Sequence, residues 1–373
     1  MEEGDFMSLS GDRIRELRIQ HDMTLDDVAK YLGINRQAVY KYEQGIVTNI
    51  PLDKIEKMAA LFGTTPDYIA NIAPYIAEKF DQIEGHGKNA NDYSVGYMWG
   101  TVGLIYNPKY IPDEETTSWD VLKNPDYAGK GLMKDAFRDV YTSLLITLNK
   151  EAIDAGEKDI RTLTFDTSDE SIRLVEDYLN SFKESVAGWE ADFGKEQMTK
   201  ELAWINMSWS GDAQWAIDEA AEIGMELKYA IPETGSSVWF DGWVIPKYAK
   251  NIKAARYFIN FMCKPENALR NMDMTGYVSA IGGDEVLESM TDEEEYEPVD
   301  ASYFFGPEAD SVCVNPVMYP ARTIIEKCGM MHDVGTEKLL RMWSRVKGDS
   351  ASAWTYTLIC LVLGVLVTAV VVK

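Results

Sequence analysis

Residues 203–223 read AWINMSWSGDAQWAIDEAAEI, and this stretch decides the fold class of the chain. Its first six residues are typical of a short strand, whereas the residues from Ala213 to Ile223 follow the longer periodicity of a helix. Strands that alternate with helices are the building units of α/β proteins. The stretch therefore predicts an α/β domain.

The same alternation continues on both sides of this stretch. Further strand-like runs are Ser94–Tyr97, Val102–Tyr106 and Val238–Ile245, and further helical patterns are Ile172–Phe182 and Ile252–Met262. The Gly-rich, polar residues 84–89 precede the first of these runs and are typical of a boundary. We therefore predict a linker over residues 71–88 and an α/β domain over residues 89–350.

The N-terminal segment carries helix start and stop signals in close order. Thr24 is suited to cap a helix that Gly33 ends, because glycine tolerates the left-handed conformation found after a helix. Asn35 is suited to cap the next helix, Arg36–Glu43, and another helix is expected from about Leu52 to Phe62. Residues 1–70 are thus predicted to form a small all-α domain.

The motif TLDDVAKYLGINRQAVYKYEQG, residues 24–45, resembles the helix-turn-helix of the Cro/repressor type. The resemblance covers nearly all of residues 11–69 and implies that the second helix of the pair enters the major groove of DNA. The candidate DNA-binding residues on that helix are Asn35, Arg36, Gln37, Tyr40 and Lys41. Each of them also fits an ordinary solvated helix face, and residues 1–70 hold eight basic against twelve acidic side chains.

The C-terminal residues 354–372 read WTYTLICLVLGVLVTAVVV and carry no charge. As a helix they would extend about 28 Å, which is close to the thickness of a bilayer core. A buried core helix is the alternative, but we expect a transmembrane helix here. Arg341, Arg345 and Lys347 precede the segment and only Lys373 follows it, and the N-terminus has no signal-peptide pattern. These features predict a single-pass protein of the cell membrane with its bulk in the cytoplasm.

Composition narrows the classes of function. The chain has 373 residues, of which 36 are basic and 61 acidic, so its formal net charge of −25 argues against a broad basic surface for nucleic acids. Its three histidines are scattered, and it has no nucleotide-binding, nucleophile-elbow or zinc-protease motif. We therefore expect no enzymatic activity, no metal site and no cofactor.

Aromatic residues stand beside carboxylates at several places in the large segment. Trp209 precedes Asp212, Trp239 precedes Asp241, and Asp135 and Asp139 lie together in KDAFRDVY. An aliphatic polyamine needs this combination, since carboxylates hold its ammonium groups and aromatic faces cover its methylenes and attract cations. The alternative is that these are core residues next to loop caps.

Six motifs, in one consistent order from about Asn89 to Arg345, resemble the spermidine/putrescine-binding proteins of bacterial ABC importers. They are NDYSVGYMWGTVGLIYN, TSWDVLKNPDYAGKGLMKDAFRDVY, INMSWSGDA, VWFDGWVIP, AARYFINFMCKPENA and MTGYVSA. The resemblance implies a type II periplasmic-binding-protein-like fold with two lobes, and a periplasmic or extracellular binding domain. By motif position it implies the ligand-binding residues Trp209, Trp239, Asp241, Tyr277, Asp139 and Asp135. The first quarter of the family pattern has no counterpart here, so lobe one is expected to be incomplete and affinity reduced.

Three hypotheses follow from the conflict between these segments. The first is a solute-binding component that takes putrescine or spermidine to the permease and ATPase subunits of an ABC importer. The second is a membrane-tethered, polyamine-responsive transcription regulator that binds DNA through residues 11–69 and the membrane through residues 354–372. The third is a gene fusion without an evolved joint function.

Overall fold

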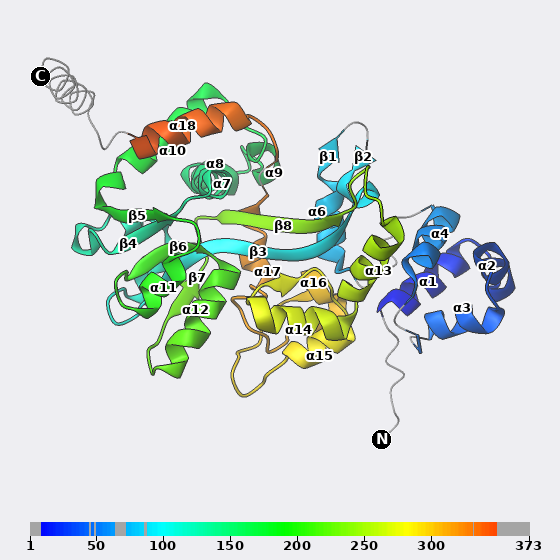
Figure 1. Cartoon of the computed structure of the whole chain (residues 1–373). Helices are drawn as coiled ribbons and strands as arrows, with labels where there is room; N and C mark the ends of the chain where they lie inside the picture. The colour runs from blue at the N-terminus through cyan, green and yellow to red at the C-terminus, as the bar shows by residue number, and fades with distance from the viewer. Residues whose placement is uncertain are drawn as a thin grey trace, which may run out of the picture.

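The computed structural model describes residues 9–44, 46–47, 50–63, 72–85, 88–330 and 332–348. These residues form an N-terminal group of helices, α1 to α4, next to a larger α/β domain built on one sheet (Figure 1). The α/β class predicted from the sequence is thereby confirmed. The segment predicted to span a membrane, residues 354–372, lies outside the described residues.

The sheet of the large domain has eight strands and is mixed. Its strands are β3 (Ser94–Tyr106), β4 (Gly131–Lys134), β5 (Val186–Glu190), β6 (Ile205–Trp209), β7 (Lys228–Ala230), β8 (Ser236–Val244), β9 (Val278–Ser279) and β10 (Cys328–Gly329). The order along the sheet is β10-β8-β3-β6-β4-β5, and β7 and β9 both pair with β3. Strand β3 is therefore the centre of the sheet, with partners from four separate parts of the chain.

The central strand differs from its prediction in one respect. The sequence predicts two short runs, Ser94–Tyr97 and Val102–Tyr106, whereas the structure has one strand of 13 residues. The glycines between and within the runs do not interrupt it, because neighbouring side chains occupy the space that a side chain would take. A Cβ at Gly103, for example, would lie 2.5 Å from Cζ of Tyr229.

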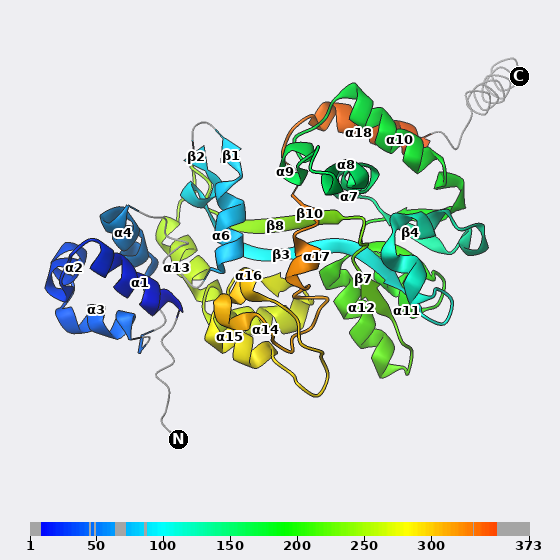
Figure 2. The same cartoon turned by 180° about the vertical axis from the view of Figure 1, so that it is seen from behind.

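Helices cover both faces of this sheet. The helices that follow α6 (Pro74–Asp81) in this domain are α7 (Phe137–Leu148), α8 (Lys150–Asp154), α9 (Ile160–Leu163), α10 (Asp169–Asn180), α11 (Gly194–Thr199), α12 (Ser210–Glu222), α13 (Ile252–Met262), α14 (Pro265–Thr275), α15 (Asp284–Met290), α16 (Ser302–Phe305), α17 (Arg322–Ile325) and α18 (Thr336–Gly348). Helices α7, α10 and α18 lie on one face, and α12, α14 and α15 lie on the other (Figures 1 and 2). The predicted helical patterns around α10, α12 and α13 are confirmed within a few residues.

Part of the predicted linker belongs to the packed domain. Within residues 71–88 the chain forms helix α6 (Pro74–Asp81), and strand β1 (Glu84–Gly85) pairs with β2 (Lys88–Asn89). Tyr75, Ile76 and Phe80 of α6 are buried in the core against the sheet. The backbone N–H of Ala73 also donates to the carbonyl of Ala280 at 2.9 Å, which ties this segment to the domain.

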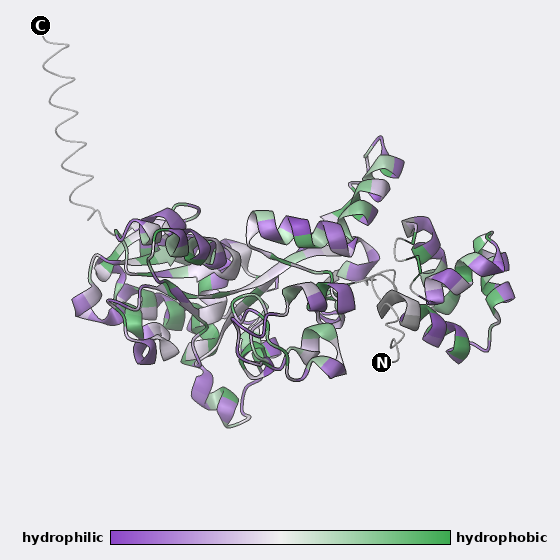
Figure 3. Cartoon of the chain, turned by 90° about the horizontal axis from the view of Figure 1, so that it is seen from below, coloured by the Kyte–Doolittle hydropathy of each residue, from purple (hydrophilic) through white to green (hydrophobic). Residues whose placement is uncertain are grey.

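The N-terminal helices α1 to α4 pack around a core of their own. They are α1 (Leu9–Gln20), α2 (Leu25–Leu32), α3 (Arg36–Glu43) and α4 (Leu52–Phe62). Thr24 and Asp27 form a reciprocal capping box at the start of α2, and Gly33 ends that helix with a φ of 66°. Asn35 caps α3 by accepting from the N–H of Ala38 at 2.8 Å. Figure 3 shows hydrophilic and hydrophobic residues side by side along these helices, as expected when one face of each is buried.

Within the part of the chain that the structure describes, every helix is too short or too polar to cross a bilayer.

Candidate functional site

The register of the sheet brings two tryptophans to one face. Trp239 of β8 lies opposite Gly100 of β3, and Trp209 of β6 lies opposite Val102 of β3. Residues two apart on a strand point to the same face, and so do directly opposed residues of antiparallel strands. Trp209 and Trp239, distant in sequence, therefore flank the central strand on one side of the sheet.

Two glycines make room for the aromatic rings at this face. A Cβ at Gly100 would lie 2.6 Å from Cζ2 of Trp239, and a Cβ at Gly211 would lie 2.3 Å from Cδ1 of Tyr277. The rings of Trp239 and Tyr277 meet edge to face, with centroids 5.4 Å apart. The absence of side chains at these two positions is thus what lets the aromatic residues converge.

Asp139 reaches the same place from helix α7. It lies in the first turn of the helix, which follows strand β4, and its Oδ2 accepts from Nε1 of Trp209 at 2.8 Å. Burial raises the pKa of Asp139 above its ordinary value, in spite of the opposing effects of the Trp209 hydrogen bond and of the cations Lys134 and Arg138. An ammonium group brought next to this carboxylate would reverse part of that shift.

These side chains line one cavity of about 310 Å³. Its lining residues are Met98, Asp139, Trp209, Trp239, Asp241 and Tyr277. Asp241 is the most exposed of them, yet partial burial still raises its pKa. The cavity thus combines flat apolar walls with two carboxylates whose charged forms are disfavoured by burial.

Five of the six predicted ligand-binding residues meet here, and Asp135 does not. Its carboxylate is bound to Nε1 of Trp343 at 2.8 Å and to the ammonium of Lys347, both on helix α18. Asp212, which also stands near a predicted aromatic residue, pairs with Lys134 at 2.9 Å. Met98 was not predicted, although it stands in the motif GYMWG and lies two residues before Gly100 on β3.

The five candidate DNA-binding residues all have exposed side chains on or just before α3. Two carry local interactions: the side chain of Asn35 caps the helix, and Arg36 pairs with Asp26 at 3.7 Å. Behind α3, Arg18 is turned inward to a bidentate pair with Glu43 at 2.6 and 2.8 Å. Arg18 therefore contributes to the core of the helical group rather than to an exposed basic face.

In the described ranges no group of three or more His, Cys, Asp and Glu residues is placed to hold a metal ion.

An α/β fold with an aromatic and acidic cavity beside its central strand is typical of proteins that bind a small molecule. The fold is that of periplasmic binding proteins. One solved structure with this fold is the substrate-binding protein PotD of a spermidine/putrescine ABC transporter from Streptococcus pneumoniae. Its TM-score to this chain is 0.52 at 21% identity, and the match covers 92% of this chain and 96% of that one. The family model for bacterial extracellular solute-binding proteins matches residues 36–290, and the chain belongs to this family. The match begins at the first residue of α3, within the N-terminal helical group.

Curated relatives are proteins that bind polyamines. The spermidine/putrescine-binding periplasmic protein of Escherichia coli is 27% identical over 187 residues, which cover 50% of this chain and 49% of that protein. The putrescine-binding periplasmic protein SpuD of Pseudomonas aeruginosa is 23% identical over 272 residues, 69% of this chain and 65% of that one. The chain thus spans about half the length of the first of these relatives.

The family corrects the predicted location. The prediction of a single-pass membrane protein with its bulk in the cytoplasm was drawn from residues 354–372 and from the charges around them. It is wrong, because the family is one of extracellular solute-binding proteins and its relatives are described as periplasmic. Flanking charges orient a segment only if it spans a bilayer, and so they carry no information on location by themselves.

Proposed function

We propose that the chain binds an aliphatic polyamine, putrescine or spermidine, in the cavity between Trp209 and Trp239, as the solute-binding component of an ABC importer. The observation that carries the proposal is the pairing of two carboxylates, Asp139 and Asp241, with three aromatic side chains in one cavity of about 310 Å³. The polyamine-binding relatives support the same choice of ligand.

The chemistry of the cavity suits a cation with an apolar body. Burial raises the pKa of both Asp139 and Asp241, so a ligand ammonium placed beside either carboxylate would stabilise its charged form. The faces of Trp209 and Trp239 suit the methylene chain, and each adds about 0.5–2 kcal/mol where it meets a cation. Asp241 is exposed, so this end of the cavity stays open to water, and we expect moderate affinity.

Isothermal titration of the full chain with putrescine and with spermidine tests the proposal. We expect saturable binding of at least one of them, and roughly 10- to 100-fold weaker binding by the Asp241→Asn variant, because a hydrogen bond to a charged group contributes about 1.5–3 kcal/mol. Asp292→Asn changes an exposed carboxylate that is not part of the cavity lining; it is the matched control and should bind as the wild type does. If neither polyamine gives a heat of binding at millimolar concentration, the proposal is wrong.

A second candidate function is DNA binding by a helix-turn-helix formed by α1 to α4. The observation that favours it is that Asn35, Arg36, Gln37, Tyr40 and Lys41 are all exposed at α3, the position of the recognition helix in the Cro/repressor type. In this candidate the cavity would act as a polyamine sensor. The acidic balance of the segment opposes it, since phosphate contacts supply most of the affinity for DNA.

A gel-shift titration at low salt decides on the second candidate. The probe is duplex DNA from upstream of genes for polyamine transport. If the candidate is correct, the full chain retards the probe, and Arg36→Ala/Gln37→Ala raises the concentration needed at least tenfold, since each bidentate base contact is worth about 1–3 kcal/mol. Equal retardation by the wild type and the double variant, or none by either, would exclude sequence reading by α3.

A further inference from the structure

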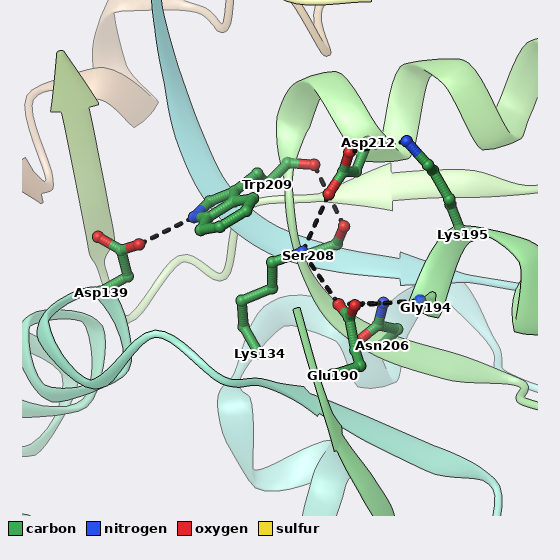
Figure 4. Close-up of polar contacts among 9 residues, drawn as sticks. All are labelled: Lys134, Asp139, Glu190, Gly194, Lys195, Asn206, Ser208, Trp209 and Asp212. Carbon is green, nitrogen blue, oxygen red and sulfur yellow. Dashed lines mark hydrogen bonds and ion pairs between the residues drawn. The ribbon is translucent and has the colours of Figure 1, made fainter. Parts of the chain in front are cut away.

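A fully buried lysine lies behind the aromatic wall of the cavity. Lys134 is the last residue of β4, and its side chain is 1% exposed. Its ammonium nitrogen lies 2.9 Å from Oδ2 of Asp212 and 3.1 Å from Oε1 of Glu190 (Figure 4). Lysine is almost never buried to this degree unless it is paired, so the two carboxylates are what hold it there.

The carboxylates that hold Lys134 are themselves fixed by the fold. Lys134 and Glu190 face each other in the parallel register of β4 and β5. Glu190 also accepts from the backbone N–H of Gly194 at 3.0 Å and from Nδ2 of Asn206 at 3.2 Å. Asp212 has a second cation, Lys195, at 3.4 Å. The ammonium of Lys134 is thus placed by side chains from β5, β6 and α12.

This ammonium also lies 3.9 Å from the ring centroid of Trp209. Lys134 is buried and does not line the cavity, so it covers the ring face that is turned toward the interior. The edge of the same ring is held by the hydrogen bond from Nε1 to Asp139. Trp209 is therefore held at its inner face and at its edge, while its remaining surface lines the cavity.

We propose that Lys134 is a positioning residue that fixes the plane of the Trp209 indole as a wall of the cavity. The geometric part of this proposal stands without a ligand, and its consequence for affinity rests on the proposed function. With a cation already at its inner face, the ring attracts a second cation less strongly, so its outer face packs on ligand methylenes. The ligand ammonium groups are then left to Asp139 and Asp241.

Fluorine NMR of the full chain labelled with 5-fluorotryptophan tests the proposal without ligand. The Trp209 signal is identified by its loss in Trp209→Phe. Lys134→Met/Glu190→Gln removes the cation together with one of its carboxylates and leaves Asp212 paired with Lys195. We expect the Trp209 signal to shift and broaden in this variant, and to stay sharp in Lys134→Arg, which keeps a cation at the ring.

The matched control is Lys130→Met, because the ammonium of Lys130 lies 5.2 Å from the ring of Trp204 and not near Trp209. It should move the Trp204 signal and leave the Trp209 signal unchanged. An unchanged Trp209 signal in Lys134→Met/Glu190→Gln would overturn the proposal. If the double variant does not fold, the Lys134→Arg spectrum decides, since a broadened Trp209 signal in that folded protein contradicts positioning by the cation.

Putrescine added to the same samples separates this proposal from the proposed function. We expect the Trp209 signal of the wild type to move on titration, and the double variant to bind roughly tenfold more weakly. If the wild type shows no response to putrescine, the proposed function fails, while the comparison of the ligand-free spectra still decides on the role of Lys134.

Discussion

Replacing Lys134 by methionine alone is expected to lower the free energy of unfolding by about 3–5 kcal/mol, the cost of removing one partner from a buried ion pair. The change leaves Glu190 and Asp212 without the ammonium that lies about 3 Å from each, at sites where water cannot replace it. Methionine fills nearly the same volume, so the loss would report the charge and not a cavity. Urea unfolding followed by far-UV circular dichroism measures it.

Two further variants separate burial of charge from loss of packing. Lys134→Met/Glu190→Gln should recover a large part of the loss, because Glu190 no longer carries a buried charge and Asp212 keeps Lys195. Lys195→Met also removes a cation from Asp212, but Lys195 is 32% exposed and lies 3.4 Å away, so its loss should cost less than about 1 kcal/mol. A Lys134→Met variant as stable as the wild type would show that the cluster is not an ion pair in solution.

Many helices and strands of the large domain could be predicted from the sequence, because their local residue patterns agree with the structure that they form. Strand and helix periodicities located β6, β8, α10, α12 and α13, and the capping pattern of Thr24 and Gly33 located the ends of α2. The pairing of strands that are distant in the chain could not be predicted from these local patterns. The two predicted runs of β3 left a gap that contains Gly100, and only the structure shows that the ring of Trp239 fills the space beside this glycine.

The candidate site also has residues that the sequence predicted and residues that only the structure places. The motif resemblance supplied five cavity residues but also Asp135, which is turned toward Trp343 and Lys347 of a helix some two hundred residues later. Lys134 left a weaker signal: a charge at the end of an apolar strand, matched by Glu190 at the end of VAGWE. Only the parallel register of β4 with β5 turns those two charges into a pair.

Asp139→Asn should raise the stability of the free protein and weaken ligand binding at the same time. Burial, more than the repulsion of Asp241, holds the pKa of Asp139 above its ordinary value in the folded state. The folded protein therefore binds this proton more tightly than the unfolded chain, and it loses stability as the pH rises from the ordinary pKa through the raised one. Asparagine keeps an acceptor for Nε1 of Trp209 and carries no charge, so the variant should be the more stable protein at neutral pH.

The same change removes a charge that the proposed ligand needs. We expect putrescine affinity at neutral pH to fall roughly 10- to 100-fold, as for loss of a charge-assisted hydrogen bond. In the wild type, affinity should decline as the pH falls through the raised pKa of Asp139, because the protonated acid no longer attracts an ammonium. That decline should be shallower in Asp139→Asn, where only Asp241 still titrates in the cavity.

Asp135→Asn is the control that makes the result specific, since Asp135 lies four residues earlier and outside the cavity lining. Burial acts to raise its pKa, but hydrogen bonds from Lys347 and Trp343 outweigh burial and lower it. A lowered pKa stabilises the folded state above the ordinary pKa, so this variant should lose stability at neutral pH and keep its affinity. The two substitutions, identical in chemistry, should thus have opposite effects on thermal unfolding, and only Asp139→Asn should weaken titration with putrescine. Equal loss of affinity in both variants would contradict the assignment of the cavity.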